Sequence, residues 1–231
     1  MQLTILSGGA AQGLVHALAT QFKVQTGCEI EGTFGAVGAM RDKLLAGAPA
    51  DMLILTAALI ADLTRAGHVV TGSAADIGTV LTAVAVREGD PVPPIGDTNA
   101  LRNALRAADG IYFPDPKLAT AGIHFAKVIE ALGLGEDLKT RLRTYPNGGT
   151  AMRALAAVKG GHPIGCTQVT EILNTPGLTL AGPLPKEFEL ATVYTIGICA
   201  KAHEPELARK FSALMTGAAA RELRERLGFG G

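Results

Sequence analysis

The chain has 231 residues, enough for one large α/β domain or for two lobes of roughly 100 residues each. Lys plus Arg and Asp plus Glu number 21 each, so the basic surface that nucleic acids or anionic membranes attract is not expected. Aromatic residues make up 4%, which argues against a cleft that stacks sugars or bases, and no apolar run reaches the roughly 20 residues that span a bilayer.

The first part of the chain alternates short apolar runs with amphipathic segments. Residues 3–6 predict a buried strand, and Leu14, Leu18 and Phe22 follow it at helical spacing. The pattern recurs twice, with strands predicted at residues 29–34 and 51–55, each followed by a helix. Consecutive βα units predict a parallel sheet with helices on its faces.

A long apolar run at residues 80–86 predicts a strand that leads into a second lobe. Pro91, Pro93 and Pro94 close it, and the βα pattern then resumes. Within this part we expect helices at residues 99–107, 121–132, 135–142 and 150–158, and strands at residues 111–113 and 164–167.

A second long strand is predicted at residues 190–199, before two helices at residues 204–215 and 218–226. If the strand near 80–86 leaves the first lobe and the strand near 190–199 returns to it, the chain crosses twice and forms a hinge. The expected fold is therefore α/β, with two doubly wound mixed sheets joined by a two-strand hinge. Lobe 1 would comprise residues 1–79 plus 196–231, and lobe 2 residues 80–195.

Glycine-rich turns follow four of the predicted strands. In doubly wound sheets, ligands bind beyond the carboxyl ends of the strands, where helix N-termini offer free N–H groups and partial positive charge. Tight βα turns alone would also explain the glycines. Four such turns, two from each predicted lobe, favour a clamp for an anion, and they lie at residues 7–10, 34–38, 120–122 and 147–151.

Polar side chains near these turns extend the predicted site. His124 lies in the first turns of its helix and Gln168 follows a strand, so both are candidates to contact the ligand, although either side chain would also suit a surface or packing position. Arg41 and Arg153 lie within about a turn of glycine-rich loops and are candidate partners of a carboxylate. The predicted ligand-binding residues are Ser7, Gly9, Ala10, Gly35, Ala36, Val37, Thr120, Ala121, His124, Ala151 and Gln168.

The sequence lacks the motifs that are typical of several kinds of site. There is no Gly-x-Gly-x-x-Gly after a strand, no Gly-Lys-Ser/Thr and no Gly-x-Ser-x-Gly, so no nucleotide cofactor and no activated serine is expected. The histidines are scattered, and a metal site is not predicted. Cys28, Cys166 and Cys199 are expected to be buried structural thiols.

Several stretches resemble the molybdate-binding proteins of ABC importers, which have the type II periplasmic-binding-protein fold. The resemblance runs the full length of the chain and rests on residues 3–6, 45–51, 114–116 with 121–123, 163–165 and 227–229. It implies a solute-binding protein with an ABC permease as a candidate partner, and no nucleic acid and no membrane insertion.

In that family two serine hydroxyls, backbone N–H groups and a tyrosine hydroxyl hold the oxyanion. Carried over by the resemblance, the serines fall on Ala10 and Val37, the backbone donors on Ala121 and near Ala151, and the tyrosine on Gln168. Each donor lost from a charged acceptor costs roughly 1.5–3 kcal/mol. The two missing hydroxyls therefore predict a divergent member that binds a small organic acid rather than molybdate or tungstate.

Two functions remain open at this point. The first is capture of a small anionic solute between the lobes. The alternative follows from the similarity of this family to the aconitate isomerases, in which His124, or less favourably Glu171, would transfer a proton along an unsaturated polycarboxylate. The first residues lack the regions of a signal peptide, so the sequence as written predicts a cytoplasmic protein, or a periplasmic one if a signal peptide has been removed.

Overall fold

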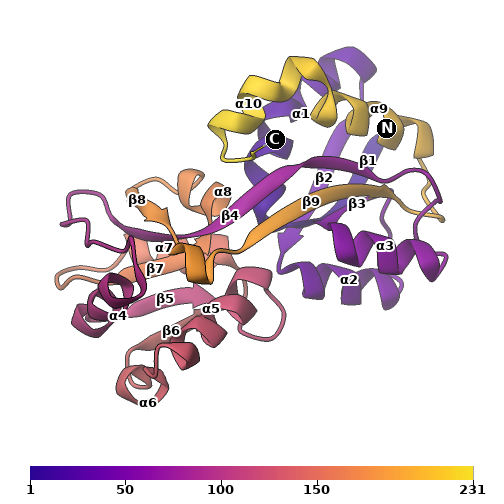
Figure 1. Cartoon of the computed structure of the whole chain (residues 1–231). Coiled ribbons are helices and arrows are strands. Elements are labelled where there is room, and N and C mark those ends of the chain that lie inside the picture. The colour runs from indigo at the N-terminus through magenta and orange to yellow at the C-terminus, as the bar shows by residue number, and fades with distance from the viewer. Residues whose placement is uncertain (231) are drawn as a thin grey trace. The chain divides into compact units, whose positions relative to one another are not determined.

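A computed structural model describes residues 1–230 (Figure 1). The chain divides into two compact units, which we call unit 1, Met1–Val80 with Thr192–Gly231, and unit 2, Leu81–Ala191. The divisions predicted from the sequence lie after residue 79 and before residue 196. Among the described helices, none is long and apolar enough to cross a membrane.

Unit 1 begins with three βα repeats, as the apolar periodicity predicts. Its sheet has the order β2-β1-β3-β9, in which β1, β2 and β3 are parallel and β9 runs antiparallel to β3. In Figure 1, α2 and α3 lie on one face of this sheet and α1, α9 and α10 on the other. The elements are β1 (Gln2–Gly8), η1 (Gly9–Ala11), α1 (Gln12–Thr26), β2 (Glu29–Gly35), α2 (Val37–Leu45), β3 (Met52–Thr56), α3 (Ala57–Arg65), β9 (Ala191–Ile198), α9 (Pro205–Thr216), η3 (Ala218–Ala220) and α10 (Arg221–Arg226).

Unit 2 combines a parallel core with two antiparallel strands. Strands β7, β5 and β6 are parallel neighbours, and β4 runs antiparallel to both β7 and β8. The elements are β4 (Ala75–Arg87), α4 (Thr98–Ala107), β5 (Ile111–Pro114), α5 (Thr120–Ala131), α6 (Gly135–Leu138), β6 (Leu142–Tyr145), α7 (Gly148–Ala156), β7 (Ile164–Gln168), α8 (Val169–Leu173), β8 (Leu178–Pro183) and η2 (Lys186–Phe188).

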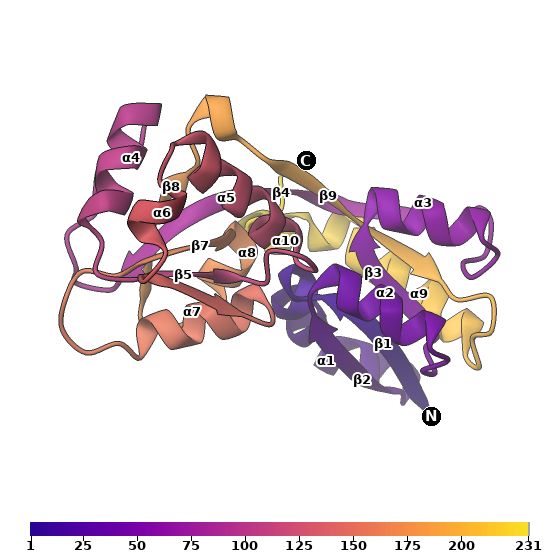
Figure 2. The same ribbon diagram turned by 90° about the horizontal axis from the view of Figure 1, so that it is seen from below.

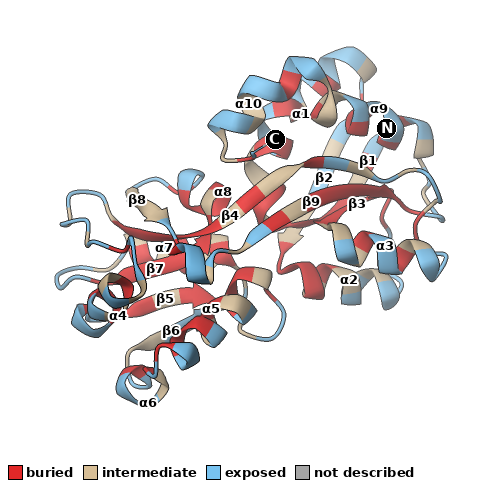
Figure 3. Ribbon diagram, in the orientation of Figure 1, coloured by how far each residue is buried: buried red, intermediate tan, exposed pale blue. Residues whose placement is uncertain are grey.

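Each face of the sheet of unit 2 has its own hydrophobic core, because strand side chains alternate between the two faces. Val84 and Val86 on β4 join Phe125 and other side chains under α4 and α5, whereas Ala83 and Ala85 pack with α7 and α8. Figure 2 shows α4 and α5 on one side of these strands and α7 on the other. The strands are largely buried and the outer faces of the helices are exposed (Figure 3).

The predicted mixed α/β fold with two lobes is confirmed. Unit 1 has the strand order β2-β1-β3-β9, and unit 2 has the order β4-β7-β5-β6 with β8 paired to β4. Strand β4 is 13 residues long and carries the division between the units.

Two strands are absent from the sequence prediction. Residues 135–142 were expected to be helical, but α6 ends at Leu138 and β6 begins at Leu142. Strand β6 has four residues, of which Arg143 and Thr144 are exposed, so it lacks the apolar run that identifies a buried strand. Strand β8 is also only partly buried and contains a glycine and a proline, which weaken the strand pattern.

All three cysteines are buried free thiols, as predicted. Burial raises the pKa of the Cys166 thiol well above its usual value. Burial, with the Asp51 carboxylate as a smaller cause, raises the pKa of Cys199 to about 12. Because the thiolate is the reactive form, these cysteines are unsuited to nucleophilic chemistry.

Candidate functional site

The first group of predicted site residues lies at the carboxyl edge of the sheet of unit 1. The register pairs Ser7 with Phe34, Gly8 with Gly35, and Ser7 with Ile54, so the parallel strands β1, β2 and β3 end side by side. The turns that follow β1 and β2 are therefore neighbours. The structure thus brings together the predicted residues Ser7, Gly9, Ala10, Gly35, Ala36 and Val37.

The Ser7 hydroxyl is already used within the chain and is not available to donate to a ligand. The residue is fully buried, and its Oγ donates a hydrogen bond to the Gly8 carbonyl at 2.8 Å. Gly9 opens η1, and the Ala10 methyl is buried. What this turn offers an anion is backbone N–H groups rather than a hydroxyl.

Helix α2 begins at the same edge without a side-chain cap. Its N-cap residue is Ala36, which has no side-chain acceptor for the N–H groups of the first turn. The first helical residue, Val37, is buried, and its Cγ1 would lie 2.8 Å from a Cβ placed on Gly8. An anion at this helix start would meet uncapped N–H groups and a hydrocarbon wall.

Tyr194 is a residue at this edge that sequence reasoning missed. It lies on β9 opposite Thr56, the last residue of β3, and its ring carbon Cε1 would be 3.1 Å from a Cβ on Gly8. Because β9 is antiparallel to β3, a residue near the start of β9 reaches the carboxyl end of β3. The position of Tyr194 depends on that pairing, for which the local sequence carries no signal.

The second group lies at the carboxyl ends of the parallel strands of unit 2. Helix α5 starts there with Ala119 as N-cap and no side-chain cap, so Thr120 and Ala121 present first-turn N–H groups. A Cβ on Gly122 would lie 2.3 Å from the carbonyl oxygens of Pro114 and Asp115. Glycine therefore allows the start of α5 to rest directly on the end of β5.

His124 and Gln168 belong to the same end of unit 2. The Nε2 of His124 is 2.7 Å from the Phe188 carbonyl, and because a carbonyl only accepts, Nε2 carries the proton and Nδ1 has the free lone pair. Gln168 is the last residue of β7 and pairs with Thr82 of β4. It lies on the face of β7 that carries Ile164 and Cys166, which pack in the core under α5.

The start of α7 differs from those of α2 and α5 because the chain itself uses its donors. The Asn147 side chain accepts from the Thr150 N–H at 2.8 Å, and the Asn147 carbonyl accepts from the Ala151 N–H at 3.0 Å. The Gly149 N–H donates to the Glu171 carboxyl. The N–H of Ala151, near which the sequence predicted a donor to the ligand, is thus bonded within the helix. Among the described residues, the Gly148 N–H has no acceptor in this first turn.

Glu171 is the buried carboxyl at this end of unit 2. Its Oε2 accepts from the Thr167 hydroxyl at 2.5 Å, and it also receives the backbone N–H groups of Gly149 and Gln168. Burial raises the pKa of Glu171 above the usual value for glutamate, although these hydrogen bonds and the charge of Arg153 act in the opposite direction. This side chain can therefore hold a proton in a pH range where exposed carboxyls have lost theirs.

Two buried hydroxyls near the end of β7 lack hydrogen-bond partners among the described residues. They belong to Thr82, which pairs with Gln168, and to Thr170, in α8. Buried polar groups are nearly always hydrogen-bonded in folded proteins, to the protein, to water or to a ligand. At this end of unit 2 these hydroxyls are therefore available to a water molecule or to a polar ligand.

The two arginines considered from the sequence have partners of their own. Arg41 Nη2 pairs with the neighbouring Asp42 carboxylate at 2.7 Å, and Arg153 Nη2 donates to Thr150 Oγ1 at 3.0 Å. Both side chains are solvent-accessible, so neither is committed to a ligand.

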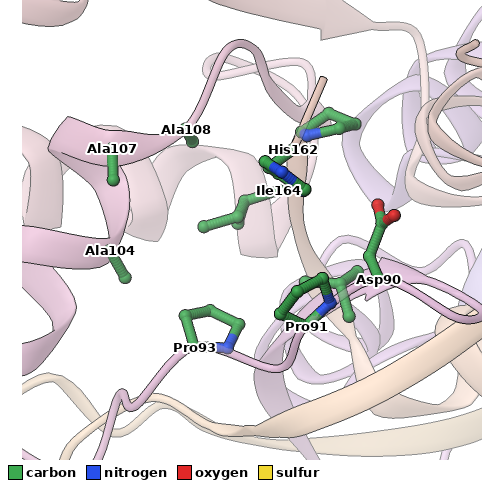
Figure 4. A pocket seen from close by; sticks show the side chains of 10 residues that line it. Asp90, Pro91, Pro93, Ala104, Ala107, Ala108, His162 and Ile164 are labelled. Carbon is green, nitrogen blue, oxygen red and sulfur yellow. The ribbon is translucent and has the colours of Figure 1, made fainter. Parts of the chain in front are cut away.

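A separate pocket of about 230 Å³ lies at the opposite, amino end of β7 in unit 2. Figure 4 shows Ala104, Ala107 and Ala108 on one side of it, and Pro91 and Pro93 across from them. Its walls are mostly hydrocarbon, with Asp90 and His162 also lining it, and none of the predicted anion-binding residues is among them. This pocket is therefore distinct from the glycine-rich turns.

Comparison with known proteins shows which families the whole chain is similar to. A family model described as bacterial extracellular solute-binding protein matches residues 3–230. The chain is 26% identical to an aconitate isomerase of Pseudomonas sp. over 215 residues, which cover 90% of this chain and 79% of that protein. It is 23% identical to the molybdate-binding protein ModA of Escherichia coli (strain K12) over 240 residues, which cover 99% and 88%.

Solved structures show the same fold. The periplasmic molybdate-binding protein of Azotobacter vinelandii superposes with a TM-score of 0.80 at 20% identity, covering 98% of each chain. A structure titled L-phospholactate-bound PEB3 superposes with a TM-score of 0.71 at 15% identity, covering 99% of each chain. At these identities the structural likeness establishes the fold, and the ligands belong to those proteins.

Proposed function

Because the chain belongs to the bacterial extracellular solute-binding protein family and has its two-lobed type II periplasmic-binding-protein fold, we propose that it binds a small organic anion through backbone N–H groups at helix starts. The observation that carries this proposal is the pair of uncapped helix starts at α2 and α5. Each follows a parallel strand, and each offers first-turn N–H groups with no side-chain acceptor of its own.

The lining of the α2 start favours an organic ligand. Ala10 and Val37 present methyl groups where a tetrahedral oxyanion would need hydroxyl donors, and the Ser7 hydroxyl is already engaged with the Gly8 carbonyl. A carboxylate can take the N–H groups while a short carbon skeleton contacts the methyl groups. Molybdate and tungstate are therefore expected to bind weakly.

The anion-binding relatives support the charge of the ligand. Molybdate and phospholactate, named for two of the similar proteins, are both small anions. Since ABC-importer context is typical of the family, we expect an ABC permease as partner and the periplasm as compartment.

The test is substitution of Gly35, which directly precedes Ala36, the N-cap of α2. In Gly35→Asp the new carboxylate would lie beside the N–H groups that the ligand's charge needs, and binding should be lost. Gly35→Ala is the matched control, because its methyl would approach only the flexible Cε of Met40, at 2.8 Å, and binding should be kept.

The measurement is a thermal-shift screen of small carboxylates and oxyanions, followed by calorimetry on the hits. A ligand present at 100 times its Kd should add about 2.7 kcal/mol to the stability of the parent protein. If Gly35→Asp binds the hit as well as Gly35→Ala does, the α2 start is not part of the site. Sub-micromolar binding of molybdate would contradict the argument from Ala10 and Val37.

Isomerisation of an unsaturated polycarboxylate is the second candidate function, and the similarity to an aconitate isomerase over 90% of the chain favours it. In this reaction a base would remove a proton from one allylic carbon, and the resulting acid would return it to the other. The free Nδ1 of His124 is the candidate base, and helix N-termini would stabilise the negative charge that develops.

Interconversion of cis- and trans-aconitate, followed by ultraviolet absorbance, tests this candidate. His124→Ala should lower the turnover by a factor of about 10²–10⁴ if the imidazole is the base. His124→Gln is the control for structure, since its amide can still donate to the Phe188 carbonyl but cannot act as a base. Equal turnover in both variants and the parent would exclude His124 as the base. A parent protein without turnover would leave solute binding as the remaining candidate function.

A further inference from the structure

Gly148 leaves a space that the carboxyl of Glu171 fills. A Cβ on residue 148 would lie 1.9 Å from Glu171 Oε2 and 2.1 Å from Thr167 Oγ1, closer than real Cβ contacts allow. The carboxyl therefore rests against the first residue of α7. Three donors hold it there, the Thr167 hydroxyl and the N–H groups of Gly149 and Gln168, and the residue is only 8% exposed.

The donor that α7 retains lies next to this carboxyl. The N–H groups of Gly149, Thr150 and Ala151 are used within unit 2, so an anion bound at this helix start would contact Gly148. It would then lie beside Glu171. Two negative charges a few ångströms apart in a buried site do not both persist, and the usual outcome is that one group takes up a proton.

We propose that Glu171 determines which anions unit 2 accepts, by taking up one proton when a carboxylate ligand binds at Gly148. This inference rests on the proposed function and deepens it. An ionised Glu171 would repel an anion at Gly148, whereas a protonated Glu171 would donate a short hydrogen bond to a ligand carboxylate. The burial that already raises the pKa of Glu171 works in the same direction.

The surroundings of Glu171 contain few other groups that change charge. The charged group that faces it is Arg153, on α7, whose guanidinium is exposed and always protonated. On β7 the titratable residue is Cys166, which lies in the core on the other face and whose pKa is raised by burial. Strand β8 has no ionisable side chain. Proton uptake in this region is thus assigned to Glu171.

A buried hydroxyl beside Glu171 is an independent observation. Thr170 directly precedes Glu171 in α8, and its Oγ1 is buried without a hydrogen-bond partner among the described residues. The other such hydroxyl, that of Thr82, lies on the face of β4 that carries Val84 and Val86, and it does not bear on this position. A bound organic acid would supply an acceptor to Thr170.

The experiment is calorimetry with tricarballylate, a saturated tricarboxylate that cannot undergo allylic proton transfer. Binding is measured from about pH 5 to about pH 8 in buffers with different heats of ionisation, which gives the number of protons taken up. The parent should take up about one proton more per bound ligand than Glu171→Gln does. Relative to the affinity of Glu171→Gln, which carries the ligand's own titration, the affinity of the parent should also fall about tenfold per pH unit above the pKa of Glu171.

Two further variants make the test independent of the folding of Glu171→Gln. Thr167→Val removes a donor that stabilises the ionised carboxyl, so the pH at which affinity begins to fall should move upward. Glu136→Gln is the matched control, because this glutamate is on α6, its side chain is 91% exposed, and its loss should change nothing.

The outcomes separate this inference from the proposed function. If tricarballylate binds and the parent and Glu171→Gln take up the same number of protons, Glu171 has no such role while anion binding stands. An unchanged pH profile in Thr167→Val would overturn the inference in the same way. If neither tricarballylate nor any screened carboxylate binds the parent, the proposed function and this inference both fail.

Discussion

At the scale of single residues, Gly148 and Gly149 are neighbours with opposite requirements. A Cβ on Gly148 would collide with the Glu171 carboxyl and the Thr167 hydroxyl, whereas a Cβ on Gly149 would find its nearest atom, Arg153 Nη1, at 3.4 Å. Both residues lie in the first turn of α7. The sequence shows only a pair of glycines, and the contact with Glu171 distinguishes them.

We therefore predict opposite effects of alanine at these two positions. Gly148→Ala should destabilise the protein by about 1–3 kcal/mol, because the methyl group must displace a hydrogen-bonded carboxyl from a packed site. Gly149→Ala should be neutral or stabilising by up to about 1 kcal/mol, since alanine is the better helix former and space is available. Urea unfolding at neutral pH measures both, and equal stability of the two variants would show that the carboxyl does not occupy this space.

At the scale of secondary-structure elements, Asp51 joins three parts of unit 1. Its carboxylate accepts the N–H of Thr4 on β1 at 2.8 Å, and the N–H groups of His203 and Glu204, just before α9, at 2.7 and 2.9 Å. The residue is buried directly before β3. It thus joins the segment just before α9 to the amino ends of β1 and β3, at the edge of the sheet opposite the predicted ligand turns.

The helix starts differ in whether a side chain caps their first-turn N–H groups. Helices α3, α4 and α7 have side-chain caps from Thr56, Asp97 and Asn147, respectively. Alanine without a side-chain cap stands at the N-cap of α1 and α10, which continue from η1 and η3, and of α2 and α5, which follow parallel strands. An uncapped start is less stable by roughly 0.5–2 kcal/mol. The first-turn N–H groups of such a helix have no side-chain acceptor. A bound anion at the end of the parallel strand can therefore serve as their acceptor.

At the scale of the whole molecule, unit 2 is continuous in sequence and unit 1 is not. The larger core cluster of unit 2 runs from Val84 to Leu184, entirely within the unit, and β4 pairs with β7 and β8 through residues 82–87. Unit 1, in contrast, needs β9 and α9 from the end of the chain.

We accordingly predict that a fragment of residues 81–191 folds by itself. It should show α/β circular dichroism and a cooperative urea transition, because its core and its strand pairs are complete. A fragment of residues 81–173 is the control, since it lacks β8 and leaves one edge of β4 unpaired, and it should be clearly less stable. A fragment 81–191 that unfolds without cooperativity would contradict the division into units.

Much of the element order could be predicted from the sequence because it depends on local patterns. The apolar periodicity of residues 3–22 is sufficient for β1 and α1, and the observed α4 and α5 begin and end within one residue of the predicted ranges. The glycine-rich turns could also be found, since a tight βα turn needs glycine whatever the rest of the fold does. The ligand role of these turns stays a prediction.

The tertiary structure alone decided which donors are available and which side chains surround them. Glu171 reaches the start of α7 from another helix and takes the Gly149 N–H, while Tyr194 reaches Gly8 because β9 is antiparallel to β3. Sequence periodicity is set by backbone geometry over a few residues and therefore identifies helices and strands. Contacts between residues distant in the chain depend on strand order and register, so whether a helix start is free for a ligand or already filled by a carboxyl was determined only when the chain had folded.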